Sequence, residues 1–548
     1  MQLGKTPNAA MIDCPVVIVG AGPVGLALAA ELGWRGVECL VIERRAGTVT
    51  HPKTNTLSTR TMEFCRRWGI ANEIRAAGWP REAPLNVVYV TSLSGGHRIG
   101  GLNFPPYGER TPMLHTPEGS QRCSQLVVDP ILQRHAMSLP TVTARFETEF
   151  EHFREIPDGI AATVRDRRSG ERTTVRSQYI IGCDGAESAV RNALGIPLEG
   201  PSALGHEMNI LFESQDLLKY HSAFQACMYW LYGSDGLWGQ LVAVDGRGLW
   251  RLTLKLPRPA EDVGSFDALA AIRRAVGADI NCNIRSLLPW NRRRVVARTY
   301  GSGRVFLAGD AVHQFSPTGA LGMNTGLQEA VDLGWKLAGT LQGWGGSSLL
   351  ASYEAERRPI ALVNNASSAN MYLMLAGLPF GPEINEDTER GREIRERARA
   401  IIEAKTHRDS YENEGVTVGY RYDASPICVD DGSPAPPLGS LRYTPTARPG
   451  ARAPHAWLRD GRSTLDLFGN GFTLLRLGYE APSPESIMRA ADDAGLPLSA
   501  VAIEEPHVLE LYERRLVLVR PDGHVAWRAD TAPDNPRMLV DRVRGANG

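Results

Sequence analysis

Residues 15–25 of this chain are PVVIVGAGPVG, an apolar run followed by three closely spaced glycines. Gly20, Gly22 and Gly25 have GxGxxG spacing, and the segment after them, LALAAELGWRG, has helical composition. The first glycine allows a tight turn, the second lets backbone approach a pyrophosphate, and the third permits close packing of helix on strand. The stretch therefore predicts a strand–turn–helix unit whose helix N-terminus faces the phosphates of a dinucleotide.

An acidic residue follows at the spacing that a dinucleotide site needs. The next apolar run, VECLVIE, comes after the expected helix and ends at Glu43. A carboxylate at this place in the motif can accept hydrogen bonds from a ribose. Because a basic residue would be needed beside a 2'-phosphate, Glu43 argues against NADP at this position and leaves FAD or NAD. A glycine-rich turn on a purely structural unit is the alternative.

Two later strand ends carry a carboxylate next to glycine. In CDGAESAVR, Asp184 follows the apolar run QYIIG, where a helix-capping turn is the simpler explanation. In VFLAGDAVHQFSPTGALGMNTG (residues 305–326), Asp310 can bond a polyol such as ribityl, or can cap a helix. The loop 317–325 offers backbone N–H groups at a helix start, suited to a pyrophosphate or an electron-rich flavin edge.

These motifs, in this order, resemble the class A flavoprotein monooxygenases, the aromatic hydroxylase family that includes p-hydroxybenzoate hydroxylase and phenol hydroxylase. The similarity covers essentially the full chain and continues in DLGWKLAG, SYEAERRP and GYRYDASPI. The tail and THPKTNTLSTRTMEFCRRWGI (residues 50–70) are most similar to 2,4-dichlorophenol hydroxylases and indolocarbazole-tailoring oxygenases. The resemblance implies that the dinucleotide is FAD. It also implies the residues that contact it: Gly20, Gly22, Pro23, Val24, Gly25, Glu43, Arg44, Gln125, Asp184, Asp310, Pro317, Gly322, Met323 and Asn324.

The same resemblance implies an α/β fold with a Rossmann-like FAD-binding domain. A β-sheet substrate domain is inserted, as in p-hydroxybenzoate hydroxylase, and a thioredoxin-like domain is at the C-terminus. The expected boundaries are 12–200 and 296–385 for the FAD-binding domain, which includes β-rich pieces near 85–120, 201–295 for the substrate sheet, 386–448 for a helical segment and linker, and 449–548 for the C-terminal domain. The last contains no cysteine, which excludes thiol redox chemistry there.

The implied activity is FAD-dependent hydroxylation of a phenolic or polycyclic aromatic substrate. In this chemistry NAD(P)H reduces FAD, O2 adds at flavin C4a, and the hydroperoxide transfers one oxygen to the ring. The partners are then the aromatic substrate, O2, and NADPH or NADH, which the sequence does not distinguish. Two alternatives remain open. One is a flavin oxidoreductase of the same fold that does not insert oxygen, and the other is a non-catalytic flavin- or ligand-binding protein.

The base that activates the phenol is not identified by any motif. His51 lies where this subfamily often approaches the active site, although a solvent-exposed loop histidine is the simpler interpretation. His313 follows Asp310 and can orient the loop or only pack. Arg60 can lie near the flavin or form a surface ion pair.

Aromatic residues of the expected substrate sheet are candidates to line a pocket, because they give flat apolar walls. Tyr229 and Trp238 are further weak candidates for a catalytic role, with Trp230, Tyr232 and Trp250 beside them, although aromatic residues on strands are more often core. At strand period Tyr229 points to one face while Trp230 and Tyr232 share the other. Only one set can therefore face a substrate.

Three positions depart from the family's common pattern. Val312 stands where alanine is commoner, Ala320 follows Gly319 where Gly-Gly is usual, and Asp332 stands where Asn is frequent.

Composition bounds the remaining possibilities. The 548 residues are 43% hydrophobic and 22% charged, an ordinary globular mix, and the net charge of -1 argues against a nucleic-acid partner. No apolar run reaches the ~20 residues that span a bilayer, and MQLGKTPNAAMIDC lacks the order of a signal peptide. Eight scattered cysteines without a CxxC pair fit a reducing compartment and no structural zinc. We therefore expect a cytoplasmic protein without a membrane or nucleic-acid partner, for which a homodimer is compatible.

Overall fold

The computed structural model describes residues 13–201, 204–260 and 262–546. The expected domain limits at residues 12 and 548, and nearly all of the N-terminal segment discussed above, lie outside these residues. None of the described helices is both long enough and apolar enough to cross a membrane.

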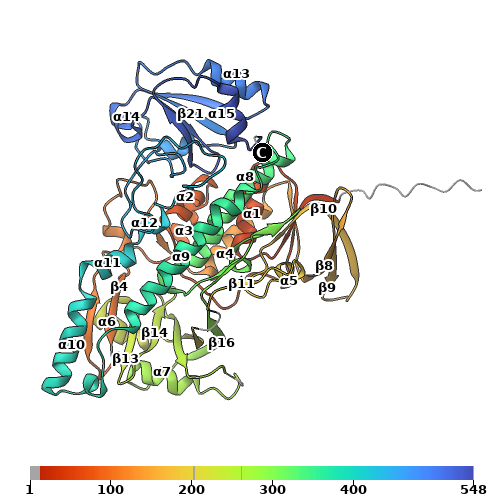
Figure 1. The fold of residues 1–548 in the computed structure, drawn as a ribbon. Helices are drawn as coiled ribbons and strands as arrows, with labels where there is room; N and C mark the ends of the chain where they lie inside the picture. Colours follow the sequence, from red (N-terminus) through yellow and green to blue (C-terminus); the bar gives the residue numbers. More distant parts are fainter. Residues whose placement is uncertain (1–12, 202–203, 261, 547–548) are drawn as a thin grey trace, which may run out of the picture.

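The glycine-rich turn follows β1, a central strand of a sheet with the order β18-β19-β10-β1-β2-β7 (Figure 1). The central strands of this sheet are parallel. A hairpin of β8 and β9 extends antiparallel from β10. β2 is buried at every position because helices cover the sheet, as is usual for parallel strands. The strands are β1 Cys14–Val19, β2 Cys39–Ile42, β7 Val142–Arg145, β8 Thr148–Ile156, β9 Gly159–Asp166, β10 Arg172–Gly182, β18 Gly301–Ser302 and β19 Val305–Leu307.

Helices from distant parts of the chain pack on this sheet. Its core joins α1 Pro23–Trp34, α4 Gln125–Met137 and α8 Leu321–Leu341. Shorter helices complete this part: α2 Thr59–Arg67, α3 Ala71–Ala77 and α5 Ala189–Ala193. Small sheets tie the connecting loops together, formed by β3 Thr56–Leu57 with β6 Gln121–Arg122, and by β11 Leu198–Glu199, β17 Val295–Ala297 and β20 His313–Gln314.

A second, seven-stranded sheet has the order β16-β12-β15-β14-β13-β4-β5. Its strands are β4 Asn86–Val90, β5 Arg98–Leu102, β12 Gly205–Glu213, β13 Ala226–Gly233, β14 Gly236–Ala243, β15 Leu249–Leu256 and β16 Asn283–Arg292. The β-rich pieces near 85–120 were expected in the FAD-binding domain, but β4 pairs parallel to β13 and so joins this second sheet. Strands that are remote in sequence complete its edge, which composition alone does not reveal.

The two faces of the second sheet have different neighbours. One face packs on α6 Leu217–Phe224 and α7 Ala268–Val276. The other face packs in part on the C-terminal half of the long helix α9 Ser352–Ala376 and on α10 Glu389–Ile402. α11 Lys405–Glu412 and α12 Glu414–Thr417 follow, and lead into an irregular segment that reaches the C-terminal domain (Figure 1).

The C-terminal domain is a four-stranded sheet in the order β22-β21-β23-β24. β21 Phe472–Leu477 and β22 Leu498–Ile503 are parallel and are connected through α13 Glu485–Asp493, whereas β23 Leu516–Val519 and β24 Val525–Ala529 form an antiparallel pair. This β-α-β unit followed by a hairpin has the thioredoxin-like arrangement. α14 Pro506–Tyr512 and α15 Pro536–Val543 complete the domain, which packs on the C-terminal end of α8 around Trp335 and Trp344.

Candidate cofactor and substrate site

Three glycines shape the turn between β1 and α1, and they do so for different reasons. Gly20 has a φ of 106°, and a Cβ there would lie 2.5 Å from the carbonyl oxygen of Cys183. A Cβ on Gly25 would lie 1.9 Å from the carbonyl oxygen of Gly20. Gly22 has an ordinary φ of -71°, and a Cβ there would meet no described atom within 4 Å. Packing therefore requires glycine at 20 and 25, whereas at 22 the free space beside the helix N-terminus fits an approaching phosphate.

The N-terminus of α8 repeats this pattern. Gly322, in its first turn, has no described atom within 4 Å of an added Cβ, although one turn later a Cβ on Gly326 would lie 2.6 Å from Val24 Cγ2. Val24 also lies 2.9 Å from the position of a Cβ on Gly309. Val24 is thus wedged between Gly309 and Gly326, which brings the first turn of α1, the Asp310 turn and the start of α8 together. Segments that are far apart in the sequence form one cradle.

Asp310 lies in a 3-10 turn, Gly309–Ala311, directly after β19. Its side chain is 39% exposed and its Oδ2 is 3.4 Å from Lys53 Nζ, whose side chain is also exposed. An accessible carboxylate beside two helix N-termini is suited to accept hydrogen bonds from ribityl hydroxyls. Lys53 adds a cation to the same edge.

Glu43 follows β2 and ties the loop after this strand to the turn between β1 and α1. Its Oε2 accepts the N–H of Ala21 at 2.8 Å and its Oε1 accepts the N–H of Arg45 at 2.9 Å. Each carboxylate oxygen keeps a lone pair for a ribose hydroxyl. Arg44 is exposed, and it is its carbonyl oxygen that accepts a hydrogen bond, from Arg167.

The motif around Asp184 has a structural role that the sequence already allowed. Its carboxylate accepts the Ser188 hydroxyl at 2.5 Å and the N–H of Val190 at 3.2 Å, and so holds the start of α5. Burial raises the pKa of Asp184, although these hydrogen bonds oppose the rise. Asp184 also lies beside Gly20, because the Cβ position of Gly20 is 3.0 Å from its Cα. It therefore supports the pyrophosphate turn from below.

Two amides hold the loops around the cradle. Gln125 Oε1 accepts the N–H groups of Lys53 and Thr54 at 2.7 and 3.2 Å. Asn324 Oδ1 accepts from the N–H of Ser58 and the hydroxyl of Thr61, and its Nδ2 donates to carbonyl groups of residues 56 and 320. The Asn324 side chain is thus fully used inside the protein, so any contact with a cofactor falls to its backbone.

The glycine-rich loop contains one strained residue. Pro317 precedes a 3-10 turn, Gly319 has a φ of 82°, and Ala320 follows with a φ of 55° at the N-cap of α8. A left-handed conformation costs an alanine roughly 1–2 kcal/mol. A glycine at position 320 would avoid this strain. Met323 is partly buried and packs on the core of the first sheet.

The second sheet presents polar side chains toward these loops. Gln240, Thr253 and Asn209 are directly opposite one another on β14, β15 and β12, and so share one face. Arg251 and Lys255 are two residues either side of Thr253 on β15 and share its face, and Lys255 is opposite Glu207 of β12. Arg251 Nη1 donates to the carbonyl groups of residues 52 and 53 at 3.0 Å. This face therefore looks toward the cofactor loops.

Arg292 on β16 completes that contact. It binds Glu207 through Nε and Nη2 at 2.7 and 2.5 Å, and donates through Nη1 to the hydroxyl of Ser316. The guanidinium also lies 4.2 Å from the ring of Tyr372 on α9. Burial raises the pKa of Glu207, and the nearby arginine opposes the rise. These polar residues were missed because each alternates with a core residue on its strand. That alternation is the signal that could have found them.

Tyr229 and Trp238 are on the opposite face. Tyr229 is fully buried and its hydroxyl is 2.9 Å from His221 Nδ1. Trp238 stacks on Arg274 of α7, at 4.1 Å. Neither side chain is on the face toward the cofactor loops, so we do not retain them as catalytic candidates. Trp230 is on the loop-facing side, where its Nε1 donates to Tyr411 at 2.7 Å.

His51 is in the loop that Arg251 holds, and it is not the exposed residue that its context suggested. Its Nδ1 is 2.7 Å from Ser286 Oγ, and its Nε2 is buried without a hydrogen-bond partner among the described residues. Burial, aided by Arg251, lowers the pKa of His51 to about 4. The imidazole is neutral at pH 7 and is a weak base.

Arg60 is neither at the cradle nor on the surface. It is buried, bonds Glu63 at 2.9 Å and donates to the carbonyl oxygen of Asp522 at 2.6 Å. It therefore joins α2 to the C-terminal domain.

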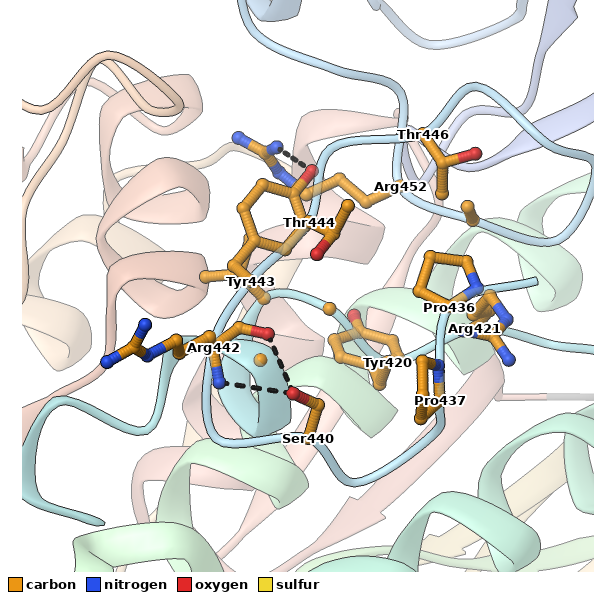
Figure 2. Close-up of a pocket in the computed structure, with 14 residues that line it drawn as sticks. Tyr420, Arg421, Pro436, Pro437, Ser440, Arg442, Tyr443, Thr444, Thr446 and Arg452 are labelled. Carbon is orange, nitrogen blue, oxygen red and sulfur yellow. Dashed lines mark hydrogen bonds between the residues drawn. The ribbon is translucent and has the colours of Figure 1, made fainter. Parts of the chain in front are cut away.

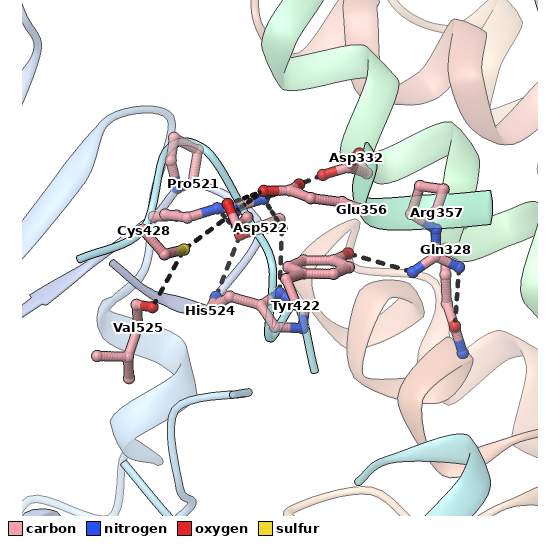
Figure 3. Close-up of polar contacts among 12 residues, drawn as sticks. Gln328, Asp332, Glu356, Arg357, Tyr422, Cys428, Pro521, Asp522, His524 and Val525 are labelled. Atoms are coloured by element: carbon pink, nitrogen blue, oxygen red, sulfur yellow. Dashed lines mark hydrogen bonds and ion pairs between the residues drawn. The ribbon is translucent and has the colours of Figure 1, made fainter. Parts of the chain in front are cut away.

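A second buried cluster makes the same connection through α8 and α9 (Figure 3). Arg520 bonds Asp332 at 3.1 Å, Glu356 at 2.6 Å and Asp522 at 2.8 Å. Lys336 bonds Asp332 at 2.8 Å and Glu356 at 2.6 Å. All five side chains are almost completely buried. The C-terminal domain is thus fastened to both helices that flank the cradle.

The pocket in Figure 2 is not a substrate site. It lies between residues 418–421, the segment 436–446 and Arg452. Its volume of about 20 Å³ has room for about one water molecule.

Two helix N-termini with open glycines, an accessible carboxylate and a ribose acceptor fit a dinucleotide with a polyol chain, which defines a flavoprotein. A family model described as FAD binding domain matches residues 13–366, and one described as Aromatic-ring hydroxylase, C-terminal, matches residues 446–546. The chain belongs to this family of FAD-dependent aromatic-ring hydroxylases, and it is a flavoprotein monooxygenase. FAD is its cofactor, and NAD(P)H is the co-substrate typical of the family.

Three known proteins illustrate the similarity. The 2,4-dichlorophenol 6-monooxygenase of Delftia acidovorans is 32% identical, over 98% of this chain and 99% of its own. RebC, soaked with chromopyrrolic acid and holding 7-carboxy-K252c, is 40% identical with a TM-score of 0.91, over 98% and 100% of the two chains. The flavin-dependent monooxygenase PieE, in complex with FAD and substrate, is 32% identical with a TM-score of 0.88, over 98% and 100%.

Proposed function

We propose that this enzyme hydroxylates a fused-ring phenol that lies between the cofactor loops and the loop-facing side of the seven-stranded sheet. The observation that carries the proposal is that Met228, Gln240 and Thr253 are partly exposed in the middle of that sheet. Most of the other residues of β13, β14 and β15 are buried. Partly exposed amide and hydroxyl groups beside the apolar side chain of Met228 are suited to a planar ligand with oxygen substituents.

The width of the polar row supports a substrate of several rings. Gln240, Thr253 and Asn209 are on three adjacent strands, so the row extends over roughly 10 Å. A single ring would contact about half of it. A single-ring phenol is the second candidate, which the 2,4-dichlorophenol 6-monooxygenase relative supports.

The bound cofactor would supply the activation of O2. The residues of this chain would bind and orient the cofactor and the substrate, and would polarise the substrate. The N-termini of α1 and α8 hold the phosphates and the electron-rich ring edge, and Asp310 and Glu43 hold the polyol and ribose. Arg292 and Ser316 fix the glycine-rich loop to the substrate wall. The loops also exclude water, which protects a reactive oxygen donor from hydrolysis.

Positively charged side chains near the substrate, and not a strong base, would favour the ionised form of the phenol. Arg251, Arg292 and Lys255 are on the loop-facing side, where Glu207 is opposite Lys255 and binds Arg292. Arg251 is buried and has no carboxylate within 4 Å among the described residues. Burial lowers the pKa of Arg251 to about 10, which still leaves the side chain charged at pH 7. An excess of positive charge lowers the pKa of a nearby phenol. Neutral His51 then serves as a hydrogen-bond partner.

The test is aerobic oxidation of NADPH and of NADH by the purified enzyme with a panel of single-ring and fused-ring phenols. Isotopically labelled O2 is used, and products are scored for one labelled oxygen. A labelled product from a fused-ring phenol is the expected result. Consumption of nicotinamide without oxygenated product for every compound would contradict the substrate class, and anaerobic turnover would separate uncoupling from dehydrogenation.

A matched pair of variants locates the substrate. Gln240→Leu should raise KM or the fraction of uncoupled turnover, whereas Tyr229→Phe, on the opposite face, should leave both unchanged. Equal effects of the two would contradict this placement.

A cytoplasmic location and a homodimer complete the proposal. All eight cysteines are free, as is usual in a reducing compartment. Native mass measurement across protein concentration tests the dimer.

A further inference from the structure

Glu329 is a buried carboxylate that none of the cofactor motifs includes. It is on α8, one turn after Gly326, and its exposure is 0%. Among the described residues, no lysine or arginine nitrogen lies within 4 Å of it, and its ionic neighbour is His313, with Nε2 at 3.2 Å from Oε2. A buried carboxylate without a cationic partner is costly, so its position needs an explanation.

The contacts of Glu329 lie at both ends of the turn that carries Asp310. Glu329 Oε2 accepts the N–H of Gly309 at 2.9 Å, directly before Asp310. His313, just beyond the other end of the turn, is fully buried and stacks on Phe315 with ring centroids 4.3 Å apart. Glu329 therefore fixes the first residue of the turn by a hydrogen bond, and the buried imidazole packs against the same carboxylate just beyond the last residue, while the Asp310 carboxylate stays accessible.

The turn needs such a tie because its conformation is unusual. Gly309 has a φ of 66°, and packing of Val24 leaves no space for a side chain there. Gly309 and Gly326 are also close, since a Cβ on Gly326 would lie 3.0 Å from the Cα of Gly309. Close approach of the turn to α8 depends on Gly326, and the hydrogen bond from Gly309 to Glu329 then sets its orientation.

We propose that Glu329 and His313 are positioning residues for FAD, which act by orienting the Gly309–Ala311 turn so that Asp310 meets the polyol of the cofactor. This inference rests on the assignment of Asp310 to the cofactor. The experiment below therefore includes a variant of Asp310 itself.

The test compares FAD dissociation constants of full-length variants, by titration of FAD into the apoprotein. Glu329→Leu removes the acceptor and should weaken FAD binding about tenfold, the effect of one lost charge-assisted hydrogen bond. Glu329→Gln keeps an amide oxygen for the Gly309 N–H and should bind within about threefold of the wild type. A merely structural role predicts no such rescue. Glu31→Gln, at a buried carboxylate on α1 whose partners Arg35, Arg67 and Trp68 lie outside the cradle, is the control. It should change stability without changing FAD affinity.

A double-mutant cycle decides whether Glu329 acts through Asp310. If it does, Glu329→Leu combined with Asp310→Asn should bind FAD no more than about twofold more weakly than Asp310→Asn alone. If the fold-changes of the two single variants multiply in the double variant, the inference is overturned. Wild-type FAD affinity of Glu329→Leu would also overturn it. If Asp310→Asn also binds normally, the cofactor assignment of Asp310 falls with it.

His313→Phe keeps the stack on Phe315 and tests the pair if Glu329→Leu does not fold. It should weaken FAD binding at least threefold. Wild-type affinity of this variant would overturn the inference.

Discussion

Asp332→Asn should stabilise the protein above pH 7 and change little near pH 5. Asp332 belongs to a buried cluster in which three carboxylates, with Glu356 and Asp522, face two cations, Lys336 and Arg520. The cluster therefore carries one excess negative charge when all its groups are ionised. Burial raises the pKa of Asp332 to about 7, with the neighbouring carboxylates adding to the rise and Lys336 and Arg520 opposing it.

The sign and size follow from linkage. The folded protein holds the Asp332 proton more tightly than the unfolded chain, so stability is lost as pH rises from the unfolded pKa toward the folded one. The difference between the ordinary 3.8 and about 7 corresponds to about 4 kcal/mol at most. Asparagine cannot ionise and avoids this loss. It forms weaker hydrogen bonds to Lys336 and Arg520 than a carboxylate does, so we expect a net gain of roughly 1–3 kcal/mol at pH 8.

Other titratable groups of the cluster could add their own pH dependence to the stability, but none of them changes charge in the pH range of this prediction. Burial lowers the pKa of His524 to about 4, so it is neutral in this range. The pKa of Glu356 is lowered to about 2, because Arg520 and Lys336 outweigh burial. Burial opposes the ionised form of Asp522 as well, but Arg520 outweighs it and keeps the pKa of Asp522 well below its usual value. Only Asp332 changes charge near neutrality in this cluster.

The assay is denaturant unfolding of wild type and variant from pH 5 to 8.5 with saturating FAD, so that ligand linkage is the same for both. The diagnostic is the difference in unfolding free energy as a function of pH, because unrelated titrations cancel. Asp522→Asn is the control, and it should be destabilised by a similar amount across this whole range. A pH-independent difference for Asp332→Asn, or a wild type that gains relative stability as pH rises, would refute the reasoning.

Three further changes test the cradle. Gly22→Val should fold, because an added Cβ meets no described atom within 4 Å, but it should purify colourless because the side chain occupies the phosphate position; a yellow protein would contradict this. Asp310→Ala should weaken FAD binding by roughly 5- to 150-fold, from the loss of ~1–3 kcal/mol, as measured by FAD titration; full occupancy at low FAD would sink the assignment. Ala320→Gly should raise the melting temperature slightly, because release of the left-handed strain exceeds the entropy cost of glycine by up to about 1 kcal/mol; a lowered melting temperature would show that the strain is not there.

The class of fold and the cofactor could be predicted because the motif residues meet conformational and packing requirements of a short segment. Gly20, Gly25 and Asp310 are set by a turn, a close approach and a strand end, and these requirements appear in a short window of sequence. The family comparisons confirm the α/β fold, the FAD cofactor and the monooxygenase class. The individual contacts with FAD stay predictions.

What could not be predicted depends on contacts between distant segments. Pairing of β4 with β13 joins strands that are far apart in the sequence, and nothing in Asn86–Val90 alone indicates its partner. His51 has the local context of an exposed loop, yet Ser286 and Arg251 enclose it. Arg60 has the pattern of a surface residue on α2, but the C-terminal domain covers it. Each of these residues changes its role through a partner that sequence proximity does not supply.

The position of Arg520 has a consequence for how the protein can be made. This side chain, which the C-terminal domain supplies, is the group that neutralises Asp332 and Glu356 on the helices beside the cradle. A shortened gene that stops after the FAD-binding match would leave those acids facing Lys336 alone and would uncover the apolar surface of Trp335. During synthesis the ribosome must release the turn after β23, which carries Arg520, before this core can close. The two segments that the family models match are therefore separate in sequence, but the first needs the second to complete its buried core. Attempts to shorten the enzyme should leave the C-terminal domain in place.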